Sequence, residues 1–208
     1  MTNKLISAPR VYGLEEAIIA SGFPKRPEAP SEEEYEDKVD ELMFEIHGAE
    51  RESIPHIKRA YKLGGAPRGS GHDNFLKGIT VSFNLNFTVK AWTEAERYHW
   101  FDIVSSMSSM HCLTKMDFDE CFCERVTENT KNEMKRLLQI WYENPTADNE
   151  LNLLYNCPTG LQLMARISTN YLQLKTIYAQ RKSHRLPEWR EFCKWVETLP
   201  LADKLICM

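Results

Sequence analysis

The chain has 208 residues, of which 42% are hydrophobic and 27% are charged, and its formal net charge at pH 7 is −4. This composition is typical of a globular protein with a single core, and it lacks the basic stripe with which a protein neutralises the phosphates of a nucleic-acid polymer. Because no apolar run reaches the roughly 18 residues of a membrane span and no signal-peptide pattern opens the chain, we expect a cytoplasmic protein that does not cross a membrane.

The six cysteines favour a reducing compartment. They include one Cys-x-Cys pair, Cys121 and Cys123, with His111 and Cys112 upstream, which is half of a zinc-site pattern. A second Cys/His pair at the spacing of a zinc finger is missing from the sequence. We therefore expect reduced, structural cysteines and no bound metal.

The N-terminal part, residues 1–63, is predicted to be helical after an irregular segment or short strand. The second helix has the clearest start, because Ser31 and Glu34 form a capping box in front of an acidic run. The helices of this part are expected over residues 14–21, 31–46 and 52–63.

The rest of the chain mixes strand and helix patterns. Hydrophobic and polar side chains alternate over 79–87, which predicts a half-buried strand. Thr93 and Glu96 form another capping box, which predicts a helix over 94–110. Further helices are expected over residues 130–143, 148–155, 168–181 and 188–198. The sequence therefore predicts a single domain over 1–208, of the α/β class, with more helix than strand.

Three stretches carry residues suited to chemistry, and the first is the glycine-rich segment 64–72, which leads into Asp73 and Asn74. Glycines let backbone N–H groups approach a phosphate, and the imidazole of His72 can stack or hydrogen-bond. The pattern is neither a P-loop nor a dinucleotide fingerprint. On the pattern alone, a flexible surface turn is the simpler interpretation.

The second stretch, Ser105 to His111, places four serines and a histidine at the end of the predicted 94–110 helix. Serine hydroxyls suit contacts with anions, and a helix C-terminus raises the affinity of a histidine for its proton. His111 would then be a cation for a phosphate group. A frayed helix end packed against a neighbour explains the same composition equally well.

The third stretch is the predicted helix 168–181. At a period of 3.6, Asn170 and Arg181 share a face with the apolar residues Ile167, Leu174, Ile177 and Tyr178. A guanidinium on such a face needs an anion or a carbonyl edge, and positive charge gathers here in Arg181, Lys182, His184 and Arg185. The alternative is that Arg181 lies at the helix end and interacts with water and the terminal carbonyls.

The order of these stretches resembles the flavin-dependent thymidylate synthase family, and more closely its divergent phage-encoded members. The resemblance covers roughly residues 69–198. Its most specific part is Pro158, Asn170 and Arg181, which have the same separations as the Pro…Asn…Leu-Arg series of the family. His184 and Trp189 then match the His and Trp that follow this series in the family.

Two further segments match the family less closely. Gly71-His72-Asp73-Asn74-Phe75 resembles the family's Gly-His-Glu-Thr-Pro-Phe segment, and the strand 79–87 follows it as in the family. Arg97-Tyr98-His99 and the later Ser105 to His111 stand in the place of an Arg-His-Arg…Ser signature, although the triplet is not intact. The arginine that precedes the proline in the family is Leu154 here.

The resemblance implies a central antiparallel or mixed sheet flanked by helices, and a C5-methyltransferase that acts on a deoxypyrimidine monophosphate, dUMP or a variant such as dCMP. FAD would be the cofactor, with methylenetetrahydrofolate and NADPH as co-substrates. The family assembles as a homotetramer with sites shared between subunits. Carried over by resemblance, the cofactor-binding residues are His72, Asn74, Arg97, His99, Asn170 and His184.

The same resemblance assigns substrate binding to Ser109, His111 and Arg181. Arg181 would also be the catalytic residue, because its fixed donors can stabilise charge that develops on the pyrimidine carbonyl. Two other interpretations stay open: a non-catalytic nucleotide-binding or interaction protein on the same scaffold, and a structural phage protein that binds no nucleotide.

Overall fold

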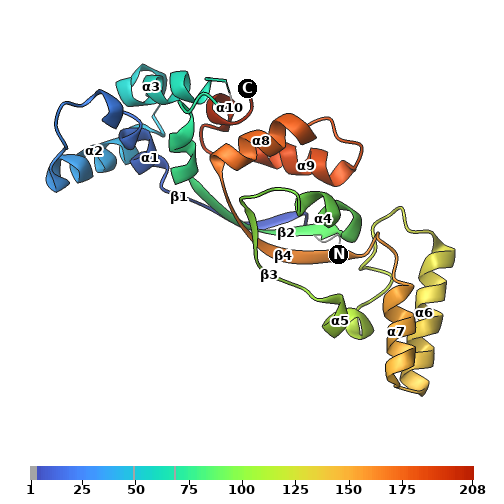
Figure 1. Ribbon diagram of the computed structural model, residues 1–208. Helices are drawn as coiled ribbons and strands as arrows, with labels where there is room; N and C mark the ends of the chain where they lie inside the picture. The colour runs from blue at the N-terminus through green and yellow to red at the C-terminus, as the bar shows by residue number, and fades with distance from the viewer. Residues whose placement is uncertain (1–3, 49, 68) are drawn as a thin grey trace. The chain divides into compact units, whose positions relative to one another are not determined.

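The computed structural model describes residues 4–48, 50–67 and 69–208 (Figure 1). They form an α/β fold with 52% helix and 16% strand, which confirms the predicted class. In chain order the elements are β1 (Ile6–Tyr12), α1 (Leu14–Ala20), η1 (Phe23–Lys25), α2 (Glu32–Glu45), η2 (Arg51–Ser53), α3 (Pro55–Gly64), η3 (Asn74–Gly78), β2 (Thr80–Thr88), α4 (Val89–Ala95), β3 (Phe101–Ser106), α5 (Ser109–Cys112), η4 (Leu113–Lys115), α6 (Glu128–Glu143), α7 (Ala147–Tyr155), β4 (Gln162–Asn170), α8 (Tyr171–Arg181), α9 (Pro187–Val196) and α10 (Ala202–Leu205).

The four strands form one antiparallel sheet with the order β1-β2-β4-β3. The chain divides into two compact units. Unit 1 comprises Met1–Ala8 and Phe83–Ile167, and unit 2 comprises Pro9–Ser82 and Ser168–Met208. The single domain expected from the sequence stays a prediction.

Unit 2 has a core built by helices from both ends of its sequence. Side chains of α1, α2 and α3 are buried with those of α8, α9 and α10, including Ile18, Leu42, Ile57, Leu174, Ile177, Trp189, Phe192 and Leu205. The predicted capping residue Ser31 accepts a hydrogen bond from the Glu34 backbone N–H at 3.1 Å and so opens α2. Arg59 of α3 closes α1, because its guanidinium donates to the Ser21 hydroxyl at 3.0 Å and to the Ile18 carbonyl at 2.9 Å.

Unit 1 has its own hydrophobic cluster, formed by Leu113, Phe118, Cys121, Phe122, Met134, Leu137, Leu153 and Leu161. The paired helices α6 and α7 supply three of these eight side chains, Met134, Leu137 and Leu153, and each helix begins at a capping threonine. Thr127 and Thr146 accept hydrogen bonds from the backbone N–H groups of Thr130 and Asn149. The helices expected over 130–143 and 148–155 are therefore confirmed.

The predicted helix 94–110 is wrong. The helix in this region is α4, which begins five residues earlier than predicted, because the capping residue is Thr88 rather than Thr93. Thr93 lies inside α4, and its hydroxyl donates to the Lys90 carbonyl at 2.8 Å. After α4 the chain forms strand β3, which pairs with β4 at an edge of the sheet.

The predicted helix 168–181 begins too early. The segment up to Asn170 belongs to strand β4, and only Tyr171–Arg181 is helical. Ile167 is therefore a buried strand residue, whereas Leu174, Ile177 and Tyr178 form the buried face of α8 as expected. No described helix is long and apolar enough to cross a membrane.

Candidate functional site

The glycine-rich loop of unit 2 exposes two of the predicted cofactor-binding side chains, His72 and Asn74. Gly69 and Gly71 have φ angles of +84° and +78°, in the left-handed region that favours glycine. A Cβ at Gly69 would meet no atom within 4 Å, and one at Gly71 would meet only the Asn74 side-chain nitrogen at 3.7 Å. The backbone of this loop is therefore open to the approach of a ligand.

A buried ion pair holds this loop against α8. Lys175 donates to the Asp73 carboxylate at 2.9 Å and to the backbone carbonyls of Gly64 at 2.6 Å and Ala66 at 3.3 Å. The Asp73 side chain is 3% exposed and the Lys175 side chain 11%. Both ends of the loop are thus attached to one ammonium group, and His72 and Asn74 flank its carboxylate partner in the sequence.

Asn170 has a different local role from the one expected. It is the N-cap of α8, and its side-chain oxygen accepts a hydrogen bond from the Gln173 backbone N–H at 2.9 Å. The expected helical face shared by Asn170 and Arg181 is therefore wrong, because Asn170 precedes the helix. Its amide nitrogen is the group left for a ligand to contact.

Arg181 ends α8 and is half-buried against α9. Its guanidinium carbon lies 5.1 Å from the centre of the Trp189 ring, within the range of a cation–π contact. Its Nη1 atom lies 2.8 Å from Nε2 of His184. Because a guanidinium can only donate, Nε2 is the acceptor in this contact, and the Leu186 backbone N–H donates to Nδ1 of the same ring at 3.3 Å.

The neighbourhood of Arg181 therefore has a fixed geometry. The flat guanidinium contacts the Trp189 ring and the His184 imidazole, and these two rings orient it. Trp189 is fully buried between α8 and α9, so the ring itself is well anchored. This arrangement suits recognition of a planar, electron-rich ligand edge.

The other predicted site residues lie in unit 1, and they are spread over two segments. Arg97 and His99 lie in the turn between α4 and β3 rather than on a helix, and both are exposed. The Arg97 side chain is 73% exposed and lies 3.9 Å from Glu94. Ser109 and His111 lie on the short helix α5, with Ser109 half-buried and His111 exposed.

The structure thus brings together, within unit 2, the loop of His72 and Asn74 with α8, and Arg181 with His184. It places Arg97 and His99 apart from Ser109 and His111 within unit 1, with strand β3 between them. In the described ranges, no group of three or more His, Cys, Asp and Glu side chains is arranged to hold a metal ion.

No sequence pattern indicated the Lys175–Asp73 pair. Its two members are 102 residues apart, and no local pattern links them. The only available signal was a lysine in the middle of an apolar helix, which needs a buried partner.

No protein-family model matches the chain, and no curated protein matches its sequence. Among solved structures, the flavin-dependent thymidylate synthase ThyX from Helicobacter pylori, complexed with FAD and dUMP, matches with a TM-score of 0.70 and 16% sequence identity over 98% of each chain. A second structure of that enzyme with FAD and dUMP matches with a TM-score of 0.68 and 15% identity, over 97% of this chain and 96% of the other. The chain has the fold of ThyX, and the resemblance inferred from its sequence is confirmed at that level.

Proposed function

We propose that the chain is a flavin-dependent, thymidylate-synthase-like C5-methyltransferase. Its substrate would be a deoxypyrimidine monophosphate, dUMP or a variant such as dCMP, with methylenetetrahydrofolate as carbon donor, FAD as cofactor and NADPH as reductant. The observation that carries the proposal is the match over 98% of both chains to an enzyme solved with FAD and dUMP.

The glycine-rich loop fits the proposed flavin. It offers open backbone at Gly69 and Gly71, where a Cβ would occupy the space that a ligand needs, beside exposed His72 and Asn74. These two side chains, with Asn170 and His184, would hold FAD in unit 2. The family resemblance assigns Arg97 and His99 to cofactor binding as well. When bound, FAD supplies the hydride that converts a transferred methylene group into a methyl group.

Arg181 would bind the pyrimidine. Its guanidinium presents two parallel N–H donors in a plane, and a pyrimidine carbonyl that gains negative charge accepts such donors. Trp189 and His184 restrict the guanidinium to one orientation before the ligand arrives, which lowers the entropic cost of binding. Ser109 and His111 would hold the phosphate.

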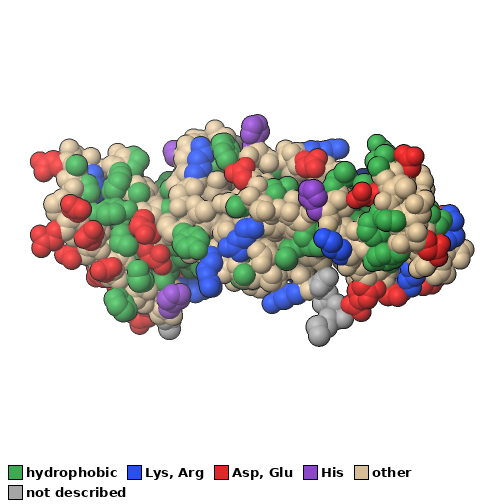
Figure 2. All heavy atoms as spheres, turned by 90° about the horizontal axis from the view of Figure 1, so that it is seen from below, with side chains coloured by type: hydrophobic (Ala, Val, Ile, Leu, Met, Phe, Trp, Pro, Cys, Tyr) green, Lys and Arg blue, Asp and Glu red, His purple; other side chains and the backbone are tan. Residues whose placement is uncertain are grey.

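The proposed enzyme would be a cytoplasmic homotetramer whose sites are shared between copies. Apolar side chains at the β3 edge support self-association, because a second copy can pair with an unprotected edge strand. These exposed residues are Trp100, Ile103, Val104, Met110 and Met164, which are 43–64% exposed. Figure 2 shows hydrophobic side chains at the surface among charged ones on the face that it draws.

A specific observation favours a second candidate function, a non-catalytic nucleotide-binding protein. Leu154, which stands where the resembled family has an arginine, packs against the hydrophobic cluster of unit 1. This position has therefore become part of a core and cannot contact a phosphate. A phage origin is likewise a proposal that rests on the sequence resemblance.

The test measures flavin binding and nucleotide binding separately. Purified protein is examined for a flavin absorbance band, with and without added FAD, and binding of dUMP and dCMP is measured by calorimetry. Arg181→Ala and Arg181→Lys should both lose nucleotide binding, because an ammonium does not reproduce the planar pair of donors. Arg185→Ala removes the same charge from an exposed position and serves as the control.

Three outcomes are informative. Flavin uptake together with Arg181-dependent nucleotide binding supports the methyltransferase. Nucleotide binding without flavin supports the non-catalytic protein. If the wild-type chain binds neither ligand, both candidate functions are wrong.

A further inference from the structure

An arginine on the sheet of unit 1 is held in place by neutral groups. Arg166 lies on β4, half-buried, between the core residues Ala165 and Ile167, so its side chain is on the face of the sheet opposite the core. Its Nη1 atom donates to the Ala8 carbonyl of β1 at 2.9 Å and to the Asn84 side-chain oxygen of β2 at 3.2 Å. The side chain therefore crosses β2 and reaches β1, two strands away in the sheet.

The two acceptors are themselves fixed. The Asn84 amide nitrogen donates to the Ser7 hydroxyl at 3.4 Å, which orients the amide that receives the guanidinium. Ala8 has a φ angle of +48°, in the left-handed region that residues other than glycine rarely adopt. Such a conformation persists only where the surrounding contacts maintain it. Three adjacent strands thus orient one guanidinium, and one of them does so with a strained residue.

The charge of this guanidinium is not balanced by a neighbouring carboxylate. Both of its acceptors are neutral and both bond to Nη1, and within residues 4–48, 50–67 and 69–208 no carboxylate forms an ion pair with Arg166. Its Nε and Nη2 atoms form the flat edge with which arginine binds two oxygens at once. In the described part of the chain, this edge has no acceptor.

Arg136 on α6, in the same unit, shows what this edge binds. Its Nε and Nη2 atoms donate to the two carboxylate oxygens of Glu133 at 2.8 and 2.7 Å. An oxyanion at Arg166 would take the place that the Glu133 carboxylate has at Arg136. Because Arg166 is already anchored through Nη1, it would lose less conformational entropy on binding than a free surface arginine.

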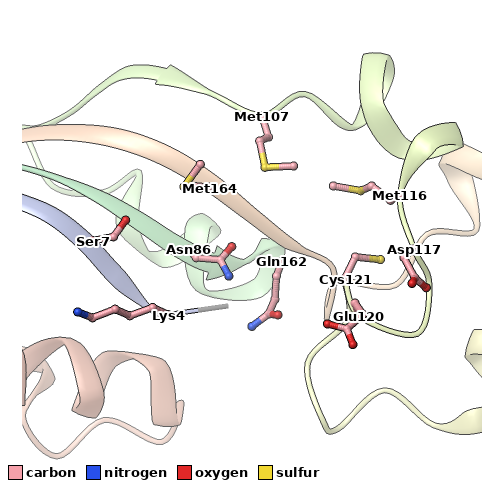
Figure 3. Close-up of a pocket in the computed structure, with 10 residues that line it drawn as sticks. All are labelled: Lys4, Ser7, Asn86, Met107, Met116, Asp117, Glu120, Cys121, Gln162 and Met164. Carbon is pink, nitrogen blue, oxygen red and sulfur yellow. The ribbon is translucent and has the colours of Figure 1, made fainter. Parts of the chain in front are cut away.

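A neighbouring cavity of unit 1 does not compete for such an anion. Its volume is about 390 Å³, and Ser7 stands in its wall (Figure 3). The carboxylates of Asp117 and Glu120 line the cavity as well, and they disfavour an anion inside it. The anion is therefore expected at the guanidinium on the sheet face and outside the cavity.

We propose that Arg166 is a binding site for an oxyanion, a carboxylate or a phosphate group, which accepts hydrogen bonds from Nε and Nη2 through two of its oxygens. Asn84 and Ala8 are positioning residues, because they hold the guanidinium by its third nitrogen. The site is independent of the proposed function, since it uses none of the residues assigned to FAD or to the nucleotide.

The experiment uses the full chain, without FAD or nucleotide, labelled with ¹⁵N in its arginine side chains. Inorganic phosphate and acetate are the probes, and sodium chloride keeps the ionic strength constant. We expect a saturable shift of the Arg166 Nε–H resonance with at least one probe. A response to phosphate alone assigns the site to phosphoryl groups, and a response to acetate alone assigns it to carboxylates. The Arg136 resonance should move far less, because Glu133 occupies its edge.

Two variants test the guanidinium. Arg166→Lys keeps the charge but lacks the two-donor edge, so it should weaken binding about tenfold. Asn84→Asp places a carboxylate against Nη1 at nearly constant size and balances the charge from within the protein. It should weaken binding by a similar factor while the thermal midpoint stays unchanged or rises, and it keeps the test valid if the lysine variant does not fold. Arg125→Lys, at an exposed position of unit 1, is the matched control.

Three results would overturn the proposal. The first is an Arg166 resonance that neither probe shifts up to 50 mM, roughly the limit of a weak single-ion site, which would leave Arg166 as a brace between β1 and β4. The second is an equal response of Arg125 and Arg166, which would show unspecific attraction of anions. The third is binding that both Arg166→Lys and Asn84→Asp leave unchanged, which would place the anion elsewhere.

Discussion

Replacing Lys175 by methionine removes the cation that holds the glycine-rich loop to α8. The substitution keeps the length of the aliphatic chain but leaves the Asp73 carboxylate, 3% exposed, without its partner. It also leaves the carbonyls of Gly64 and Ala66 without a donor. Removing one member of a buried ion pair typically costs about 3–5 kcal/mol, so we expect the free energy of unfolding to fall by about that amount.

A double-mutant cycle separates the ion pair from the packing. Asp73→Asn should cost less than Lys175→Met, about 1–3 kcal/mol, because the ammonium keeps its two carbonyl acceptors. The double variant should be more stable, by about 1–3 kcal/mol, than the sum of the two single losses of unfolding free energy predicts, because no charge is left buried.

The assay is urea unfolding at pH 7 followed by far-UV circular dichroism. Lys182→Met is the matched control, since this lysine is exposed just after the same helix, and its effect should stay within about 0.5 kcal/mol. A loss below about 1 kcal/mol for Lys175→Met, or strict additivity in the cycle, would refute the reasoning, because both would mean that the carboxylate is hydrated.

Four further outcomes are expected. Burial, and then the charge of Arg59, lower the pKa of His56. This histidine therefore contributes stability that is present above its unfolded pKa of about 6.5 and is lost as the pH falls below it. In His56→Gln, the midpoint of thermal unfolding should depend less on pH between pH 5 and 7 than it does in the wild type. Because burial raises the pKa of the Cys193 thiol to about 12, the native protein should label far more slowly there with iodoacetamide at pH 8 than the unfolded protein, as mass spectrometry would show. Gly160→Ala should cost about 1–3 kcal/mol in thermal melts, since its Cβ would lie 2.3 Å from a methyl group of Val126. If β3 pairs with a second copy, Val104→Glu should convert the proposed tetramer into smaller species in light scattering, and an unchanged mass would contradict that pairing.

The sequence predicted those elements whose signals are local. The alternation over 79–87 marks β2 because one face of that strand is buried, and Ser31 marks the start of α2 because its hydroxyl caps the helix. Strand β4 was missed because Leu163, Met164 and Ala165 are good helix formers, although pairing in the sheet decides their conformation.

The candidate site was predictable only in part. The three polar stretches were found, and two of them, the loop of His72 and the helix of Arg181, belong to the same unit of the structure. The pairing of Lys175 with Asp73 was not, because contacts between distant segments leave no trace in a single sequence. The burial of Asn86 on β2, which is 6% exposed, was hidden for a related reason. A polar residue in a strand of alternating pattern is predicted to face solvent, whereas other segments of the chain bury Asn86.

Unit 2 combines Pro9–Ser82 with Ser168–Met208, and this has a consequence for biosynthesis. When α1, α2 and α3 leave the ribosome, the helices that cover Ile57 and its neighbours have not yet been translated. At typical rates, synthesis of the intervening segment takes on the order of ten seconds. During that interval the nascent chain exposes apolar helix faces that a chaperone can bind, whereas unit 1, nearly continuous in sequence, can condense earlier. A chain that ends at residue 167 and has been released from the ribosome should therefore show protease-resistant α6 and α7 but a protease-sensitive first third.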